Sequence, residues 1–219
     1  MSRTYFDEEL KLMHLDLIKM GALIEEAIEK SIRALDPEYR HLAPEIEAGD
    51  KNIDALEKAI EARCLKLLLR QQPVARDLRA ISTAIKMITD MERIGDQAAD
   101  IADIVSRPES GSITAFAAHI PQMSKIASEM VSASIKAFID SDLDYARATI
   151  LRDDEVDDLF DVVKSELIGN LKKGTSEPDA VINAMMIAKY LERIGDHAVN
   201  ICEWVEFYIT GMHKKTKIL

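Results

Sequence analysis

Apolar residues recur every three or four positions along almost the whole chain, and no stretch sustains the strict alternation of a half-buried strand. A period near 3.6 residues is typical of amphipathic helices. Asp36-Pro37 and Gln71-Gln72-Pro73 interrupt the pattern, because proline lacks an amide hydrogen and disfavours helix in the residue before it. The first half is therefore predicted to form three helices, from about Thr4 to Leu35, from Glu38 to Arg70 and from Ala75 to Val105.

The second half repeats the pattern of the first. Residues 31–35 match residues 134–138, and the segment ERIGD at 92–96 recurs unchanged at 192–196. Self-similarity of this kind indicates a tandem duplication. We therefore predict an all-α fold of six long helices that form two tandem, pseudo-symmetric three-helix bundles. The predicted boundaries are 1–106 for the first bundle, 107–112 for a linker and 113–219 for the second bundle.

Carboxylates of the first half are predicted to meet between its second and third helices. Positions four apart share one helix face, so Glu92 lies beside Asp96. Antiparallel helices joined by a short turn bring residues equidistant from that turn to the same height. Asp50 then lies level with Asp96, and Asp54 with Glu92. Asp100 extends this first cluster by one more turn.

The second hairpin keeps the same registration although its loop is shorter. Around Gly174-Thr175, Asp153 lies level with Asp196, and Asp157 with Glu192. Nearby anions repel one another, by roughly 4 kcal/mol for a pair 4 Å apart at an effective dielectric of 20. Protonation, arginine pairing or a multivalent cation can each relieve that repulsion. The candidate metal ligands are Asp50, Asp54, Glu92, Asp96, Asp100, Asp153, Asp157, Glu192 and Asp196.

Composition narrows the functional classes. The formal net charge of -11 disfavours binding to nucleic acid or to anionic membranes. Cys64 and Cys202 lack the spacing of a disulfide framework or a thiolate zinc site, and no apolar run approaches the length of a membrane span. These features favour a cytoplasmic protein that reaches a membrane only through partners. The basic end, residues 213–217, is predicted to be a solvated, frayed tail.

The motifs resemble those of the PhoU family of phosphate-specific transport system accessory proteins. The resemblance covers the whole chain and rests on the twin ERIGD segments, on the DxxxD pattern of the second helix in both halves, and on the run QPVARDLR at 72–79. That run is degraded at 175–179 in the second half. The resemblance implies two metal-binding bundles, with iron, zinc, manganese or magnesium as the ion.

The same resemblance implies a regulatory role in place of catalysis. Family members restrain phosphate uptake and keep the Pho regulon repressed through contacts with the sensor kinase PhoR and the transporter ATPase PstB, and a homodimer is expected. The residues expected to contact partners are Arg76, Asp77, Arg79, Arg93 and Arg193. On a helical projection Arg93 and Arg193 point away from the neighbouring glutamates, so they look less able to neutralise the clusters.

Two other classes of protein remain open at this point. One is a carboxylate-bridged di-metal enzyme built in the bundle core. Such sites normally need paired ExxH elements, and the chain has one, at 38–41. The other is a purely structural helical oligomer. The sequence offers no nucleophile with a base, no Gly-rich phosphate loop and no Ser/His/Asp arrangement, which favours a protein that is not an enzyme.

Overall fold

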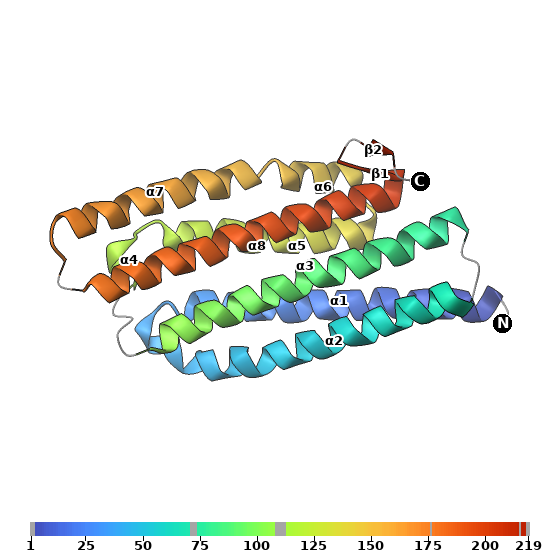
Figure 1. Cartoon of the computed structure of the whole chain (residues 1–219), viewed down its shortest axis with the longest axis horizontal. Coiled ribbons are helices and arrows are strands. Elements are labelled where there is room, and N and C mark those ends of the chain that lie inside the picture. The colour runs from blue at the N-terminus through green and yellow to red at the C-terminus, as the bar shows by residue number, and fades with distance from the viewer. Residues whose placement is uncertain (1–2, 71–73, 108–112, 176, 215, 218–219) are drawn as a thin grey trace.

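The computed structural model describes residues 3–70, 74–107, 113–175, 177–214 and 216–217, and these are almost entirely helical (Figure 1). The first half contains α1 (Arg3–Arg33), the 3-10 helix η1 (Pro37–Leu42), α2 (Ala43–Arg70) and α3 (Ala75–Ser106). The second half contains α4 (Ile113–Phe116), α5 (Ile120–Asp140), α6 (Leu143–Ile150), α7 (Asp153–Lys172) and α8 (Pro178–Thr210), followed by β1 (Met212–His213) and β2 (Thr216–Lys217). The predicted all-α fold is confirmed.

The third helix of each half lies at the centre of the molecule. Figure 1 shows α3 and α8 side by side between α2 and α7, with α1 and α5 behind them. α3 and α8 begin at opposite ends of the elongated molecule, so they run antiparallel (Figure 1). Most of the linker predicted at 107–112 lies outside the described residues, and the division into 1–106 and 113–219 stays a prediction.

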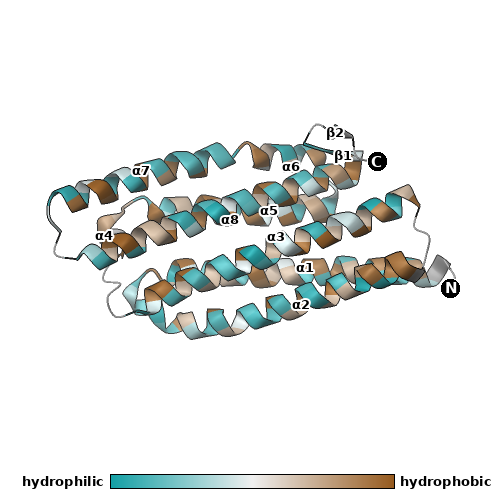
Figure 2. Cartoon of the chain, in the orientation of Figure 1, coloured by the Kyte–Doolittle hydropathy of each residue, from teal (hydrophilic) through white to brown (hydrophobic). Residues whose placement is uncertain are grey.

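The core is formed by the apolar stripes that the helical period predicts. Figure 2 shows hydrophobic and hydrophilic positions interleaved along each long helix. Ile53 and Ile60 of α2 pack with Met87 and Ile94 of α3 in one continuous buried cluster, which extends into the second half. Full burial of one such side chain stabilises the fold by about 1.5–3 kcal/mol. Both cysteines are buried and free.

The second helix begins differently from the prediction. Residues 37–42, expected as the start of a long α-helix from Glu38, form η1, whose first turn is capped by the Asp36 carboxylate accepting from the Glu38 amide at 3.0 Å. Pro44 occupies the first turn of α2 and has no amide hydrogen to donate to the Arg40 carbonyl. The α-helical ladder therefore cannot run from η1 into α2.

The described part of the C-terminal end forms a hairpin, so the prediction of a frayed tail was wrong there, although Lys214 and Thr216 are exposed to solvent as expected. Gly211 ends α8 with φ of 77°, and β1 then pairs antiparallel with β2. The His213 ring stacks on Trp204 of α8 with centroids 4.0 Å apart, and Lys214 Nζ lies 3.0 Å from a Glu203 carboxylate oxygen. Aromatic stacking holds this hairpin against the last turns of α8.

Candidate metal centres

The first cluster lies between α2 and α3, at the level that hairpin geometry predicts. Asp50 and Asp54 of α2 and Asp96 of α3 each offer one carboxylate oxygen, and the three oxygens lie within 4.8 Å of one another. Glu92, one turn before Asp96, is half-buried on the same side of α3. The structure thus brings together the carboxylates of two helices that the sequence pairs by their distance from the turn.

Burial and mutual repulsion both act on these carboxyl groups. The pKa of Asp50 is raised by burial, and then by the charges of Asp96, Asp54 and Asp100. The pKa of Asp96 is raised by burial and by Asp54, and that of Glu92 by burial and by Asp96. Each shift means that the ionised form is disfavoured in the folded protein. A cation would reverse that penalty.

The donor set fits a hard cation. Asp50 Oδ1 is buried and has no hydrogen-bond partner among the described residues. A buried anionic oxygen without a donor is costly, unless a positive charge occupies the space in front of it. Carboxylate oxygens from two helices are ligands that suit magnesium, manganese and iron better than soft metals.

A glycine in the middle of α3 allows the two helices to approach at the cluster. A Cβ added to Gly95 would lie 2.9 Å from Ile53 Cδ1 and 3.3 Å from Asp50 Oδ1. Both contacts are shorter than carbon normally tolerates, and Ile53 is itself in the core. The mid-helix glycine is therefore explained by the close packing of α3 against the residues around Asp50.

We expect Gly95→Ala to destabilise the protein by about 1 kcal/mol, since overpacking costs more than the roughly 1 kcal/mol that alanine gains in a helix. Gly195→Ala is the matched control, because its added Cβ would lie 3.5 Å from Val156 Cγ1 and 3.6 Å from Asp153 Oδ1, in ordinary contact. That variant should be neutral or gain up to about 1 kcal/mol. Urea unfolding of both variants measures the difference, and equal effects would contradict the close approach.

The second cluster lies between α7 and α8. Burial, together with the charges of Asp157 and Asp196, raises the pKa of Asp153 from 3.8 to about 6. The pKa of Asp196 is raised by burial and by Glu192, and that of Asp157 by the same two causes. The four carboxylates that the sequence pairs in this half thus interact with one another.

The two clusters differ in the charge already present beside them. In the second, Lys189 Nζ lies 2.5 Å from Glu192 Oε2, and its charge opposes the upward shifts in the pKa of Asp157 and Asp196. The position equivalent to Lys189 in the first half is Thr89. The first cluster has a different basic neighbour, since Lys58 Nζ lies 3.7 Å from Asp54 Oδ2.

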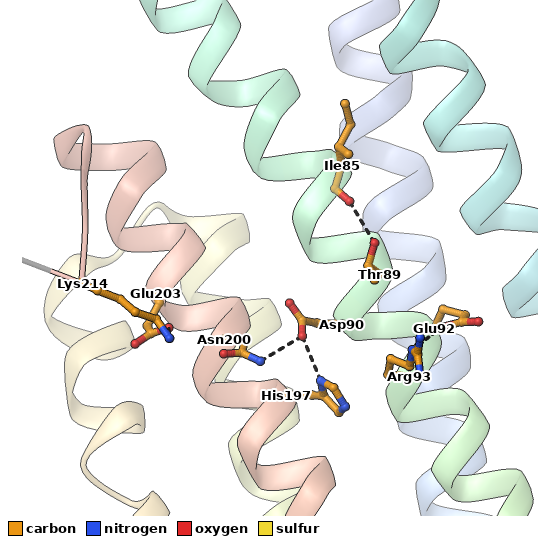
Figure 3. Close-up of polar contacts among 9 residues, drawn as sticks. All are labelled: Ile85, Thr89, Asp90, Glu92, Arg93, His197, Asn200, Glu203 and Lys214. Carbon is orange, nitrogen blue, oxygen red and sulfur yellow. Dashed lines mark hydrogen bonds and ion pairs between the residues drawn. The ribbon is translucent and has the colours of Figure 1, made fainter. Parts of the chain in front are cut away.

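Arg93 lies closer to the first cluster than the helical projection predicts. Its Nε is 3.5 Å from Glu92 Oε2, and the arginine side chain is 53% exposed (Figure 3). The expectation that Arg93 points away from Glu92 was therefore wrong. The long side chain curls back towards its neighbour. An ion pair this exposed contributes about 0–1 kcal/mol, so it neutralises the cluster only weakly.

The other residues expected to contact partners have different environments. Arg76 and Arg193 are exposed. Asp77 is buried in the first turn of α3, and Arg79 donates to the Tyr208 carbonyl of α8 at 3.3 Å. Gln72 and Pro73 of the same run lie outside the described residues. Asp77 and Arg79 thus face the interior or the other half of the chain.

Sequence reasoning missed the polar contacts that join the two halves. The Asp90 carboxylate of α3 accepts hydrogen bonds from two residues of α8, His197 Nδ1 at 2.9 Å and Asn200 Nδ2 at 3.1 Å (Figure 3). Tyr190 of α8 feels the charge of Asp100 of α3, since the pKa of Tyr190 is raised first by burial and then by that charge. Positions 100 apart correspond in the duplication, but the sequence contains no signal that pairs α3 with α8.

The lone ExxH element does not join either cluster. Its Glu38 and His41 lie in η1, where His41 Nδ1 is 3.1 Å from the Glu38 carbonyl oxygen. Within the described residues, the group of close ligand atoms contains aspartates and no histidine. The arrangement therefore lacks the paired ExxH elements that the di-metal enzyme would need.

Fold and site together define a class of duplicated all-α proteins in which each half carries a carboxylate cluster between two antiparallel helices. The family model described as "PhoU domain" matches residues 17–105 and again residues 120–205. The chain therefore belongs to the PhoU family.

Similar proteins agree with this assignment. The "Phosphate-specific transport system accessory protein PhoU homolog" of Clostridium acetobutylicum is 35% identical over 212 residues, which cover 96% of this chain and 97% of that protein. The PhoU protein of Escherichia coli is 28% identical, over 94% of this chain and 86% of that one. The crystal structure of PhoU from Pseudomonas aeruginosa is similar with a TM-score of 0.89 and 30% identity, over 94% of this chain and 100% of that one. Among the described residues, no helix is long and apolar enough to cross a membrane.

Proposed function

We propose that this protein is a cytoplasmic, non-enzymatic regulator that restrains phosphate uptake and keeps the Pho regulon repressed when phosphate is plentiful. In this proposal it acts as a homodimer, by contact with the ATPase PstB of the Pst transporter and with the sensor kinase PhoR. The observation that carries the proposal is the PhoU-domain match in both halves, supported by relatives of nearly equal length that are named accessory proteins of the phosphate-specific transport system.

The proposal includes a multivalent cation in each carboxylate cluster, with iron, zinc, manganese and magnesium as the candidates. The unpartnered Asp50 Oδ1 and the closeness of Asp54 and Asp96 support the first site. The raised pKa of Asp153 supports the second site. Four carboxylates repel one another there, and Lys189 pairs with one of them, Glu192. The cation would supply the positive charge that lets these groups stay ionised, and the carboxylates would hold α2 against α3 and α7 against α8 through it.

Partner contact in this proposal uses the exposed arginines. Arg93 and Arg193 occupy equivalent exposed positions on the two central helices, and Arg76 is exposed in the first turn of α3. A guanidinium pairs with a partner carboxylate or phosphate through two parallel hydrogen bonds. Asp77 and Arg79 would contribute indirectly, because they would hold the first turn of α3 in position.

Loss of the gene is expected to derepress the phosphate-starvation response in phosphate-rich medium. Alkaline phosphatase activity and phosphate uptake should both rise in a clean deletion strain, and the wild-type gene should restore repression. Expression of a gene with E92Q and D96N in the deletion strain then shows whether the first cluster contributes to repression. Normal repression in the deletion strain, in a genome without a second copy of the gene, would contradict the regulatory proposal.

A further inference from the structure

The groove between α1 and α2 is open at a position where the second half of the chain has an arginine. The duplication has an offset of 103 residues here, so Glu26 corresponds to Glu129 and Gly49 corresponds to Arg152. Arg152 Nη2 lies 2.9 Å from Glu129 Oε2 of α5, and Arg152 Nε lies 3.4 Å from Glu155 Oε1 of α7. This guanidinium group therefore joins two helices of the second half, whereas Gly49 has no side chain to do so in the first half.

The lining of the groove suits one long cationic side chain. Its volume is about 350 Å³, and among its lining residues Ala27 and Ile46 are buried while Glu26 and Glu45 are exposed. A Cβ added to Gly49 would meet no described heavy atom within 4 Å. Arginine packs its apolar stem on hydrophobic surface and holds its charged head beside carboxylates. The groove offers both kinds of surface at once.

The carboxylates of this groove are only half neutralised. Lys30 Nζ lies 2.9 Å from Glu26 Oε1 and 3.1 Å from Glu45 Oε2, so one lysine serves two carboxylates. In the second half two cations, Arg152 and Lys125, lie within 4.0 Å of the glutamate equivalent to Glu26, and the first half has alanine in place of that second lysine. The groove between α1 and α2 thus keeps a negative charge that its counterpart has balanced.

We propose that this groove binds an arginine side chain of a partner protein, whose guanidinium group takes the place that Arg152 has in the second half. The guanidinium pairs with Glu26, and the apolar stem lies over Ile46. The formal net charge of -11 attracts basic partners, and parallel hydrogen bonds to a carboxylate then favour arginine over lysine. The proposal requires neither a cation in the carboxylate clusters nor the proposed regulatory function.

NMR titration of the ¹⁵N-labelled full chain with N-acetylarginine amide tests this site. We expect the amide signals of Gly49 and Ile46 to shift and saturate with a Kd of roughly 1–10 mM, as suits a single charge-assisted pair. N-acetylcitrulline amide has nearly the same shape without the charge and should leave both signals in place. N-acetyllysine amide should bind at least threefold more weakly. Gly169 of α7, which is equally open to an added Cβ, supplies the control signal and should not shift.

Two arginine variants and one glycine variant locate the site. Gly49→Arg supplies the guanidinium group from the chain itself, and should weaken binding of N-acetylarginine amide at least tenfold. Gly169→Arg is the matched control, because it adds the same charge to another helical glycine with open space around it, and it should bind as wild type does. Arg152→Gly is the converse change, and should create a second site whose titration shifts the amide signal of Glu129.

Several results would overturn the proposal. Equal shifts with the citrulline amide, an equal Kd for the lysine amide, or shifts of similar size at Gly169 would leave only general attraction to an acidic surface. An unchanged Kd in Gly49→Arg, or no new site in Arg152→Gly, would contradict the equivalence of the two places. Circular dichroism checks that each variant is folded. If Gly49→Arg does not fold, Glu26→Gln replaces it, and that variant should raise the Kd severalfold, so an unchanged Kd would again refute the site.

Discussion

Addition of Mn²⁺ to the metal-free protein is expected to raise the midpoint of thermal unfolding by roughly 5–10 °C for each occupied cluster. A ligand that binds only the folded state stabilises it by about 2.7 kcal/mol at one hundred times its Kd. For a chain of this size, 1 kcal/mol corresponds to about 2–4 °C. Changing Glu92 and Asp96 together, by E92Q and D96N, should remove the contribution of the first cluster while circular dichroism shows an unchanged helix content.

The control for this experiment is a pair of carboxylates with the same spacing outside the first cluster. Asp154 and Asp158 are four apart on α7 and both exposed. Neutralising them by D154N and D158N changes the net charge equally, and should leave the contribution of the first cluster in place. If the wild-type protein gave no shift with manganese, magnesium, iron or zinc, and the purified protein contained no metal, the carboxylates would be better explained as an acidic surface for a basic partner.

The helices and the level of the carboxylates could be predicted because both depend on local geometry. The helical period fixes which residues share a face, and distance from a short turn fixes which residues of neighbouring helices meet. Asp50, Asp54 and Asp96 came together on that basis alone. A mid-helix glycine costs stability unless a neighbour needs the space, and the chain has one in each half; the structure shows the close approach at Gly95 but ordinary contact at Gly195.

The contacts between the two halves could not be predicted, because no turn relates α3 to α8. How two helices far apart in sequence rotate against each other depends on the packing of whole faces. No local pattern indicates that Asp90 of α3 meets His197 and Asn200 of α8, and the contact is visible only when both helices are placed.

The hairpin of β1 and β2 was missed for a related reason. A basic end is usually solvated, and nothing local predicts that residues 212–213 pair with residues 216–217. The stacking of His213 on Trp204 and the ion pair between Lys214 and Glu203 need the last turns of α8 to be in place first. The break between η1 and α2 was missed because it depends on Pro44, which has no amide hydrogen to donate to the carbonyl of Arg40, four residues earlier.

Neutralising Asp153 is expected to stabilise the metal-free protein at pH 7.5. The pKa of Asp153 is raised in the folded state to about 6 from 3.8. The folded state therefore binds more protons than the unfolded state between these values, and stability falls as pH rises through them. The full shift corresponds to about 3 kcal/mol, and because the carboxyl group is partly exposed to solvent we expect about 1–2 kcal/mol.

Urea unfolding of the metal-free Asp153→Asn variant at pH 4 and at pH 7.5 measures this effect. The variant should be more stable than wild type at pH 7.5 and about equal near pH 4, where Asp153 is largely protonated in the folded state and the repulsion is absent. Asp158→Asn is the control, since that exposed carboxylate should change stability little at either pH. With saturating Mn²⁺ at pH 7.5 the order should reverse, because wild type gains a cation that the variant holds weakly. A variant less stable than wild type at pH 7.5 without metal would show that Asp153 serves the fold, and that the repulsion among these carboxylates is relieved by the protein alone.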